Sequence, residues 1–239
     1  MIDRVIWLAL LLGIAVVSIG VQLDREARKT SALALQVPEL FRSGAQPRIT
    51  ALAIDAGASD MAVAQAQTLV RRRPLPARHL RLLAQAHFAA GDNETSALAI
   101  QYAAQRGWRD PLAQEAMMQI ALVAGNRPEA ARRYAALFLM ADTDRALLEK
   151  AGLEVFPQTS GEERAVFAQI VAGGERWHNT FLVRGARVIP ADAFVEIIEM
   201  SAKEGTRFRC PALRQAQRII EGKDQVLGER LSSLLQTQC

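Results

Sequence analysis

The stretch ARHLRLLAQAHFAAGDNETSALAIQYAAQRGWRD, residues 77–110, contains the pattern that decides the fold. Its pair Ala90-Gly91 is followed by a short polar turn, DNE, and then by an alanine-rich segment of high helix propensity. The pairs Ala56-Gly57 and Ala124-Gly125 stand in the same arrangement, so the pattern recurs at intervals of 34 residues. A fixed period of this length predicts helical hairpins, which bury their apolar faces only against neighbouring hairpins.

The composition also favours an all-α architecture. Half of the 239 residues are apolar but only 5% are aromatic, and the apolar share leans on alanine and leucine. A sheet protein would be richer in valine, isoleucine, tyrosine and threonine. The net charge of +4 comes mostly from arginine, which is scattered among 25 acidic residues. Because it forms no basic stripe with aromatic residues, we expect no nucleic-acid partner.

Residues 5–23, VIWLALLLGIAVVSIGVQL, form an uncharged run near the start of the chain. A helix that rises about 1.5 Å per residue just crosses a hydrocarbon core of about 30 Å over this length. We therefore expect a short tail at 1–4 and a retained membrane-spanning signal anchor at 5–23, with Trp7 at the interface. Two alternatives stay open: a buried core helix, and a signal peptide cleaved before Val21, with Ser18 and Gly20 at the small-residue positions.

The orientation of this span is indicated by two opposing signals. The tail carries only Arg4, whereas the far flank DREARK carries three basic residues, which by the positive-inside rule favours a cytoplasmic location for the rest of the chain. Cys210 and Cys239 favour the opposite, because they bracket two amphipathic helices whose outer ends meet if they fold back antiparallel. A disulfide there needs an oxidising compartment. We expect that disulfide, rather than two unpaired thiols, and a bacterial inner-membrane protein with most of its chain in the periplasm.

The repeat resembles the tetratricopeptide (TPR) family when its positions are compared one by one. With the turn glycine as position 15, position 20 holds the small residues Ala62, Ser96 and Ala130, and position 8, where helices pack most closely, holds Thr50, Ala84 and Met118. The closing proline appears only once, as Pro74. The resemblance implies a TPR-like α-solenoid of antiparallel helix pairs, in which each turn glycine takes the left-handed conformation that ends the first helix.

This reading sets the expected domain organisation. Residues 24–42 form a linker or connecting helix, and residues 174–239 form a helical C-terminal cap, with a break at Gly185 and Pro190 and a helix from Pro190 to Gly205. The repeats occupy 43–76, 77–110 and 111–144, with a degenerate fourth at 145–173.

No catalytic or metal-binding motif is present in the sequence. His79 and His87 are two turns apart on one predicted helix, about 12 Å at 1.5 Å per residue, which is too far to share an ion. His178 has no ligand partner at a suitable spacing, and there is no nucleophile elbow, phosphate-binding glycine loop or HExxH motif. We therefore expect no enzyme activity, no cofactor and no metal.

The resemblance also implies a binding surface, because TPR proteins bind extended peptides in a concave groove lined by the first helix of each repeat. Two arginines one turn apart suit a peptide carboxylate. The alternative is that they belong to an ordinary solvated helix face. The groove positions in this sequence are Arg78, Arg81, Gln85 and Phe88 in the second repeat and Leu112, Glu115, Gln119 and Leu122 in the third.

Two functions follow as hypotheses. The first is a membrane-anchored, non-catalytic scaffold for protein–protein interaction in the assembly or stabilisation of a bacterial envelope complex. The second is an accessory or regulatory subunit that docks on an integral membrane enzyme or transport complex through its membrane-spanning helix.

Overall fold

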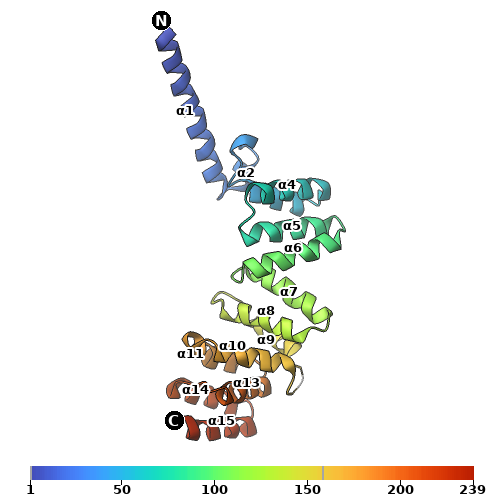
Figure 1. The fold of residues 1–239 in the computed structure, drawn as a ribbon, viewed down its shortest axis with the longest axis vertical. Coiled ribbons are helices and arrows are strands. Elements are labelled where there is room, and N and C mark those ends of the chain that lie inside the picture. The colour runs from blue at the N-terminus through green and yellow to red at the C-terminus, as the bar shows by residue number, and fades with distance from the viewer. Residues whose placement is uncertain (1, 158) are drawn as a thin grey trace. The chain divides into compact units, whose positions relative to one another are not determined.

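A computed structural model describes residues 2–157 and 159–239. Every regular element in those residues is a helix, and they contain no strand, so the all-α class is confirmed. The chain divides into two compact units, Met1–Gly107 and Trp108–Cys239, which we call the N-terminal unit and the C-terminal unit (Figure 1). Their boundary falls near the junction of the second and third predicted repeats.

The first helix, α1 (Ile2–Ala27), contains the expected apolar run. Its segment Asp3–Ala27 has a mean hydropathy of 2.4 in its most apolar window, and only 6% of that window is buried. It is therefore not a core helix of this chain. The helix is long and apolar enough to span a membrane, a property that a retained anchor and a cleaved signal share.

The rest of the N-terminal unit consists of short helices joined by tight turns. The helices are α2 (Ser31–Ala34), the 3₁₀ turn η1 (Glu39–Phe41), α3 (Gln46–Asp55), α4 (Ser59–Arg72), α5 (Ala77–Ala89) and α6 (Asn93–Arg106). Helix α3 packs on α4, α4 on α5 and α5 on α6, and α3 also contacts α5. Small side chains let these helices approach, because Ala53, Ala62, Ala66 and Ala86 form the buried cluster between them.

Residues 24–42, which the sequence suggests are a linker, are tied to α1 and α3. Asp24 belongs to α1, and its buried carboxylate accepts hydrogen bonds from the backbone N–H groups of Ser43, Gly44 and Ala45 at 2.7 to 3.0 Å. These three N–H groups belong to the turn that leads into α3, and the carboxylate satisfies them with charge-assisted hydrogen bonds. The end of α1 is thus fixed to the start of α3.

The three turn glycines have the conformation expected of them. Gly57, Gly91 and Gly125 have φ angles of 68°, 80° and 71°, a region that costs other residues free energy. After two of these turns, a polar side chain caps the next helix: Asp92 accepts from the N–H of Thr95, and Asn126 from that of Glu129.

The C-terminal unit is also helical, and its core contains a cluster of aromatic rings. Phe138, Phe156 and Phe167 surround Tyr134, with ring centroids 5.4 to 6.3 Å from the tyrosine ring. The Tyr134 hydroxyl donates to the carbonyl of Leu148 at 3.1 Å, so its one polar atom is satisfied. The longer helices are α7 (Pro111–Val123), α8 (Arg127–Leu139), α9 (Arg145–Val155), α10 (Glu162–Ala172), α13 (Ala191–Lys203), α14 (Cys210–Glu221) and α15 (Gln225–Gln238).

The prediction of a helix break at Gly185 is wrong. Helical turns run almost without interruption through η2 (Glu175–Trp177), α11 (His178–Thr180), the π-helical segment η3 (Phe181–Gly185) and α12 (Ala186–Val188). A Cβ at Gly185 would lie 2.8 Å from the ring of Phe194, so the glycine allows close packing of this segment on α13. Pro190 does end the segment, and it stands directly before α13.

Candidate functional site

The N-terminal unit contains a basic cavity of about 660 Å³. We call it the basic cavity. No acidic residue is found among the described residues that line it. The lining comes from the end of α1, from α3, from the turn after α4 and from α5, and comprises Arg28, Gly44, Pro47, Arg48, Ala51, Arg73, Pro76, Arg78, His79, Arg81, Leu82 and Gln85.

Two of the arginines are held by the junction between α1 and α3. Arg48, on α3, donates to the carbonyl of Arg28 from Nε and Nη2 at 3.1 and 3.0 Å, and to the Ser31 hydroxyl at 3.1 Å. Arg28 passes so close to Gly44 that any side chain at Gly44 would collide with it. Both arginines are therefore placed by the Asp24 contact that joins the two helices.

The α5 side of the cavity is held by His79. Its Nδ1–H donates to the carbonyl of Arg73 at 2.9 Å, which ties α5 to the turn that follows α4. Burial lowers the pKa of His79 below its ordinary value of 6.5, outweighing that hydrogen bond, and the charges of Arg78 and Arg73 lower the pKa further. The ring is neutral at pH 7, so the charge of the cavity comes from guanidinium groups alone.

These guanidinium groups make the cavity positively charged. Within the described residues, the side chains of Arg28, Arg73 and Arg78 have no hydrogen-bond or ion-pair partner, and Arg81 approaches Gln85 at 3.4 Å. The guanidinium groups of Arg28, Arg73 and Arg78 are thus available on the cavity lining, and such groups attract anions and pair well with carboxylates and phosphates. Their attraction for a ligand is partly screened by salt because the cavity is open.

Only three of the predicted groove residues line this cavity. Arg78, Arg81 and Gln85 line it, whereas Phe88, 69% exposed, lies beyond its lining at the end of α5. Glu115 and Gln119 lie on α7 in the C-terminal unit, half-buried and exposed respectively. Leu122, also on α7, packs against the core of that unit, and Leu112 is 51% exposed.

Sequence reasoning missed Arg28, Arg48 and Arg73 as members of the site. Arg28 falls in the stretch expected to be a linker or connecting helix, and Arg73 directly precedes the closing proline, Pro74. Arg48 sits in the first helix of the first repeat, where nothing in the repeat pattern marks it. Only the packing of α3 on α5 and the junction at Asp24 bring these residues beside Arg78.

The three histidines all have structural partners. His87 Nδ1 lies 3.0 Å from an oxygen of Asp92, and the ring of His178 donates from Nε2 to the carbonyl of Val171 at 2.8 Å. Hydrogen bonds from Thr95, and then His87, lower the pKa of Asp92. No group of three or more metal-ligating side chains occurs in the part of the chain that the structure describes.

The C-terminal unit contains a buried ion-pair cluster around Arg164. Arg164 is 1% exposed and contacts Asp192 and Glu196 at 2.6 Å each, and it donates to the carbonyl of Phe156. Burial would raise the pKa of Glu196, but hydrogen bonds from Ser160 and Arg164, with the charge of Arg164, hold it below its ordinary value. Because the arginine is already neutralised by two acids, we read this cluster as structural.

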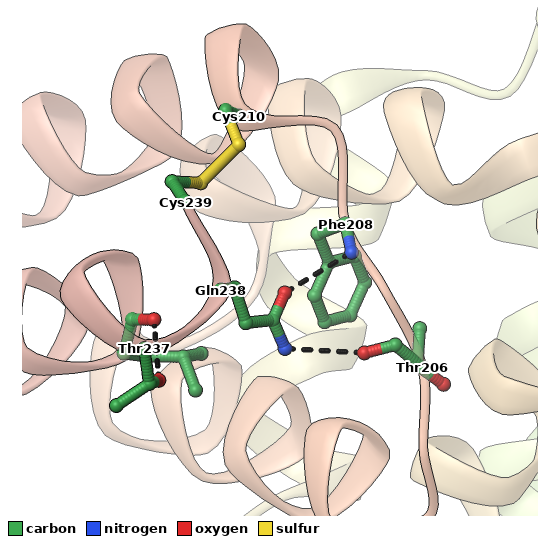
Figure 2. Close-up of a disulfide and its surroundings, with 7 residues drawn as sticks. Thr206, Phe208, Cys210, Thr237, Gln238 and Cys239 are labelled. Atoms are coloured by element: carbon green, nitrogen blue, oxygen red, sulfur yellow. Dashed lines mark hydrogen bonds between the residues drawn. A yellow bond between two sulfur atoms is a disulfide. The ribbon is translucent and has the colours of Figure 1, made fainter.

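The two cysteines lie together as a disulfide (Figure 2). The pair joins the first residue of α14 to the residue after α15, with Cα atoms 5.9 Å apart. Beside it, Gln238 accepts from the backbone N–H of Phe208 and donates to the carbonyl of Thr206, both at 3.1 Å (Figure 2). The antiparallel arrangement expected for these two helices brings their outer ends together.

In comparisons with known proteins, no protein-family model, curated protein or solved structure matches the chain.

Proposed function

We propose that this chain is a membrane-anchored, non-catalytic scaffold of TPR-like helical hairpins, which binds an acidic segment of a protein partner in the basic cavity. The observation that carries the proposal is the convergence of five arginines, with no acid among the described lining residues, on one open cavity. An extended peptide with carboxylate side chains, or with a free carboxyl terminus, matches this charge and geometry.

The TPR-like part of the proposal is supported by the hairpins. Gly57, Gly91 and Gly125 stand at 34-residue intervals with positive φ, and each joins two helices that pack on each other: α3 with α4, α5 with α6, and α7 with α8. A TPR-like α-solenoid with a helical C-terminal cap accounts for this regularity.

The location that fits best is the bacterial inner membrane, with one span and most of the chain in the periplasm. Support comes from α1, which has the length and hydropathy of a span, and from the disulfide, which persists in oxidising compartments. In that setting, the partner is another protein of an envelope complex under assembly.

Binding of acidic peptides to the full chain in detergent micelles tests the proposed site. The probes are fluorescent peptides of equal length in which only the number of glutamates and the presence of a free carboxyl terminus vary. Affinity should rise with the number of carboxylates and fall with added salt. The double variant Arg78→Ala with Arg81→Ala should weaken binding about a hundredfold or more, because charge-assisted hydrogen bonds contribute about 1.5 to 3 kcal/mol each.

Arg214→Ala with Arg218→Ala provides the matched control. These two arginines are exposed one turn apart on α14, so the control removes the same charge from another unit. Equal loss of binding in both double variants, or equal affinity for neutral peptides, would rule out the cavity as the peptide site.

A second function, docking through α1, is favoured by one specific observation. Residues 3–19 of α1 are exposed along the helix, and a Cβ at Gly13 would meet nothing within 4 Å. This surface is open to lipid or to a partner helix. Replacing residues 5–19 by an unrelated apolar span, while keeping the Gly20 contact, should abolish association with an integral membrane partner if the helix is the docking element. Full retention of that partner would count against this role.

A further inference from the structure

The segment between α2 and α3 exposes apolar side chains beside the end of α1. Residues 35–41 read LQVPELF, and we call them the apolar loop. Leu40 is 93% exposed and Leu35 is 62% exposed. In Figure 1 this part of the chain lies alongside the end of α1. Both leucines are open to solvent in this chain, and they belong to a segment near a helix that has the length and hydropathy of a membrane span.

A direct contact fixes the depth of the loop relative to the candidate span. Phe41 packs on Gly20 of α1 so closely that a Cβ at Gly20 would lie 2.5 Å from the ring. Gly20 precedes Leu23, the last residue of the uncharged run, by three residues, or about 4 to 5 Å along a helix. A segment that touches α1 at this level lies at the polar boundary of any bilayer that α1 crosses.

The loop is held rigidly in this position. Arg42 Nε donates to the carbonyl of Val37 at 2.7 Å and closes the loop on itself. Arg72, at the end of α4, donates to the carbonyls of Glu39 and Arg42 at 3.2 and 3.0 Å. Together with the Asp24 contact, these bonds fix the loop to both α1 and α4.

The charges around the loop suit an anionic surface. Glu39, its single acid, faces Arg72 at 3.6 Å. Arg71 and Arg73 are exposed on either side of Arg72, and Arg25 is exposed on α1 two residues beyond the uncharged run. Apolar side chains flanked by arginines are typical of segments that lie in the headgroup region of anionic bilayers.

We propose that the apolar loop is a second membrane contact, which inserts Leu35 and Leu40 into the interface of an anionic bilayer where α1 leaves it. This inference rests on the proposed role of α1 as a membrane anchor. The loop and the helix together give the N-terminal unit two points of attachment and so set its orientation on the membrane.

Depth-dependent fluorescence quenching on the full chain tests the proposal. The described cysteines are both in the disulfide, so a third cysteine can be labelled selectively with an environment-sensitive fluorophore under non-reducing conditions. Leu40→Cys is compared with Leu12→Cys, which lies within the span, and with Leu98→Cys, an exposed leucine on α6. The three proteins are reconstituted into vesicles of phosphatidylcholine and phosphatidylglycerol that contain quenchers at the headgroup or deep in the acyl chains.

The label at residue 40 should be quenched mainly by the headgroup quencher, the label at residue 12 by the deep quencher, and the label at residue 98 by neither. If residue 40 behaves like residue 98 while residue 12 is quenched, the loop proposal is wrong and the anchor stands. If residue 12 is not quenched at all, the anchor and the loop proposal both fail.

Discussion

At the scale of single residues, two buried charged side chains connect elements of the fold. Each forms hydrogen bonds or ion pairs with groups outside its own helix. Asp24 on α1 binds the backbone of the turn that leads into α3, and Arg164 on α10 pairs with two acids of α13. Neither role is visible in the sequence, where Asp24 reads as the polar end of an apolar run and Arg164 as one of many scattered arginines. A buried charge is tolerated only when it is paired, so removing one partner costs more than the pair contributes.

Removal of the Asp24 carboxylate should reduce the protection of nearby backbone amides against hydrogen exchange. Asp24→Ala should destabilise the junction by about 2 kcal/mol, the magnitude expected for charge-assisted capping bonds. The amides of Ser43, Gly44 and Ala45 should then exchange about 30-fold faster in hydrogen-exchange measurements on the full chain in micelles. Asp55→Ala is the control, because Asp55 is exposed at the end of α3. Unchanged protection of these amides in Asp24→Ala would contradict the cap.

The Arg164 cluster predicts a pH-dependent stability. Since the folded pKa of Glu196 lies below its ordinary value of 4.5, its contribution is complete above that pH and is lost as the pH falls through the folded pKa. Glu196→Gln should therefore lower the free energy of unfolding by about 2 kcal/mol at pH 7. The deficit should shrink toward pH 3, as followed by urea unfolding of the full chain.

Glu199→Gln serves as the control for that series. Glu199 pairs with Arg230 at 2.6 Å in a partly exposed position, so its loss should cost under about 1 kcal/mol. A larger effect for Glu199 than for Glu196, or a deficit that grows on acidification, would argue against the assigned role of the cluster.

At the scale of elements, the sequence predicts those helices whose limits are set by local chemistry. The hairpin turns follow from glycines that need a positive φ, and the two helices predicted between Cys210 and Cys239 are α14 and α15. The failures arise where distant packing decides. Gly185 reads as a helix breaker, yet the neighbouring ring of Phe194 requires the absence of a side chain there. The contacts of the stretch expected to be a linker or connecting helix, with Asp24 and Arg72, likewise have no signal in the sequence.

Substitution by alanine should affect stability differently at a glycine with positive φ and at one with ordinary φ. Gly125→Ala places a side chain at φ 71° and should destabilise the C-terminal unit by about 1 to 2 kcal/mol. Gly222→Ala should be neutral or slightly stabilising, because its added Cβ would meet its nearest atom at an ordinary 3.6 Å. Urea unfolding of both variants compares them directly, and equal destabilisation would show that the backbone conformation is not the cause.

The disulfide predicts a stabilisation of the last two helices. Cys210 and Cys239 are separated by 29 residues, and opening such a loop should cost roughly 3 to 4 kcal/mol in the chain-entropy model. Reduction of the full chain should lower its thermal unfolding midpoint. A Cys210→Ser, Cys239→Ser double variant should have the midpoint of the reduced protein, and reductant should not change it. A midpoint unaffected by reduction would mean that the bond contributes nothing to stability.

At the scale of the whole molecule, the candidate site was only half accessible to sequence reasoning. Repeat positions identify Arg78, Arg81 and Gln85, since the spacing of the first helix is enough to place them on one face. Arg28 and Arg48 enter the cavity only because α1 and α3 meet at Asp24, a contact with no sequence signature. The cavity, the apolar loop and the end of α1 all belong to the N-terminal unit, so anchoring and binding are proposed for the same part of the chain.

Site-specific photocrosslinking from Gln85 in native membranes tests the central proposal most directly, because Gln85 lines the basic cavity and is exposed. The account predicts adducts whose crosslinked peptide is an acidic segment of an envelope protein. These adducts should be lost in Arg78→Ala with Arg81→Ala and retained in Arg214→Ala with Arg218→Ala. Adducts that persist in the cavity variant, or that map to segments without acidic residues, would contradict it.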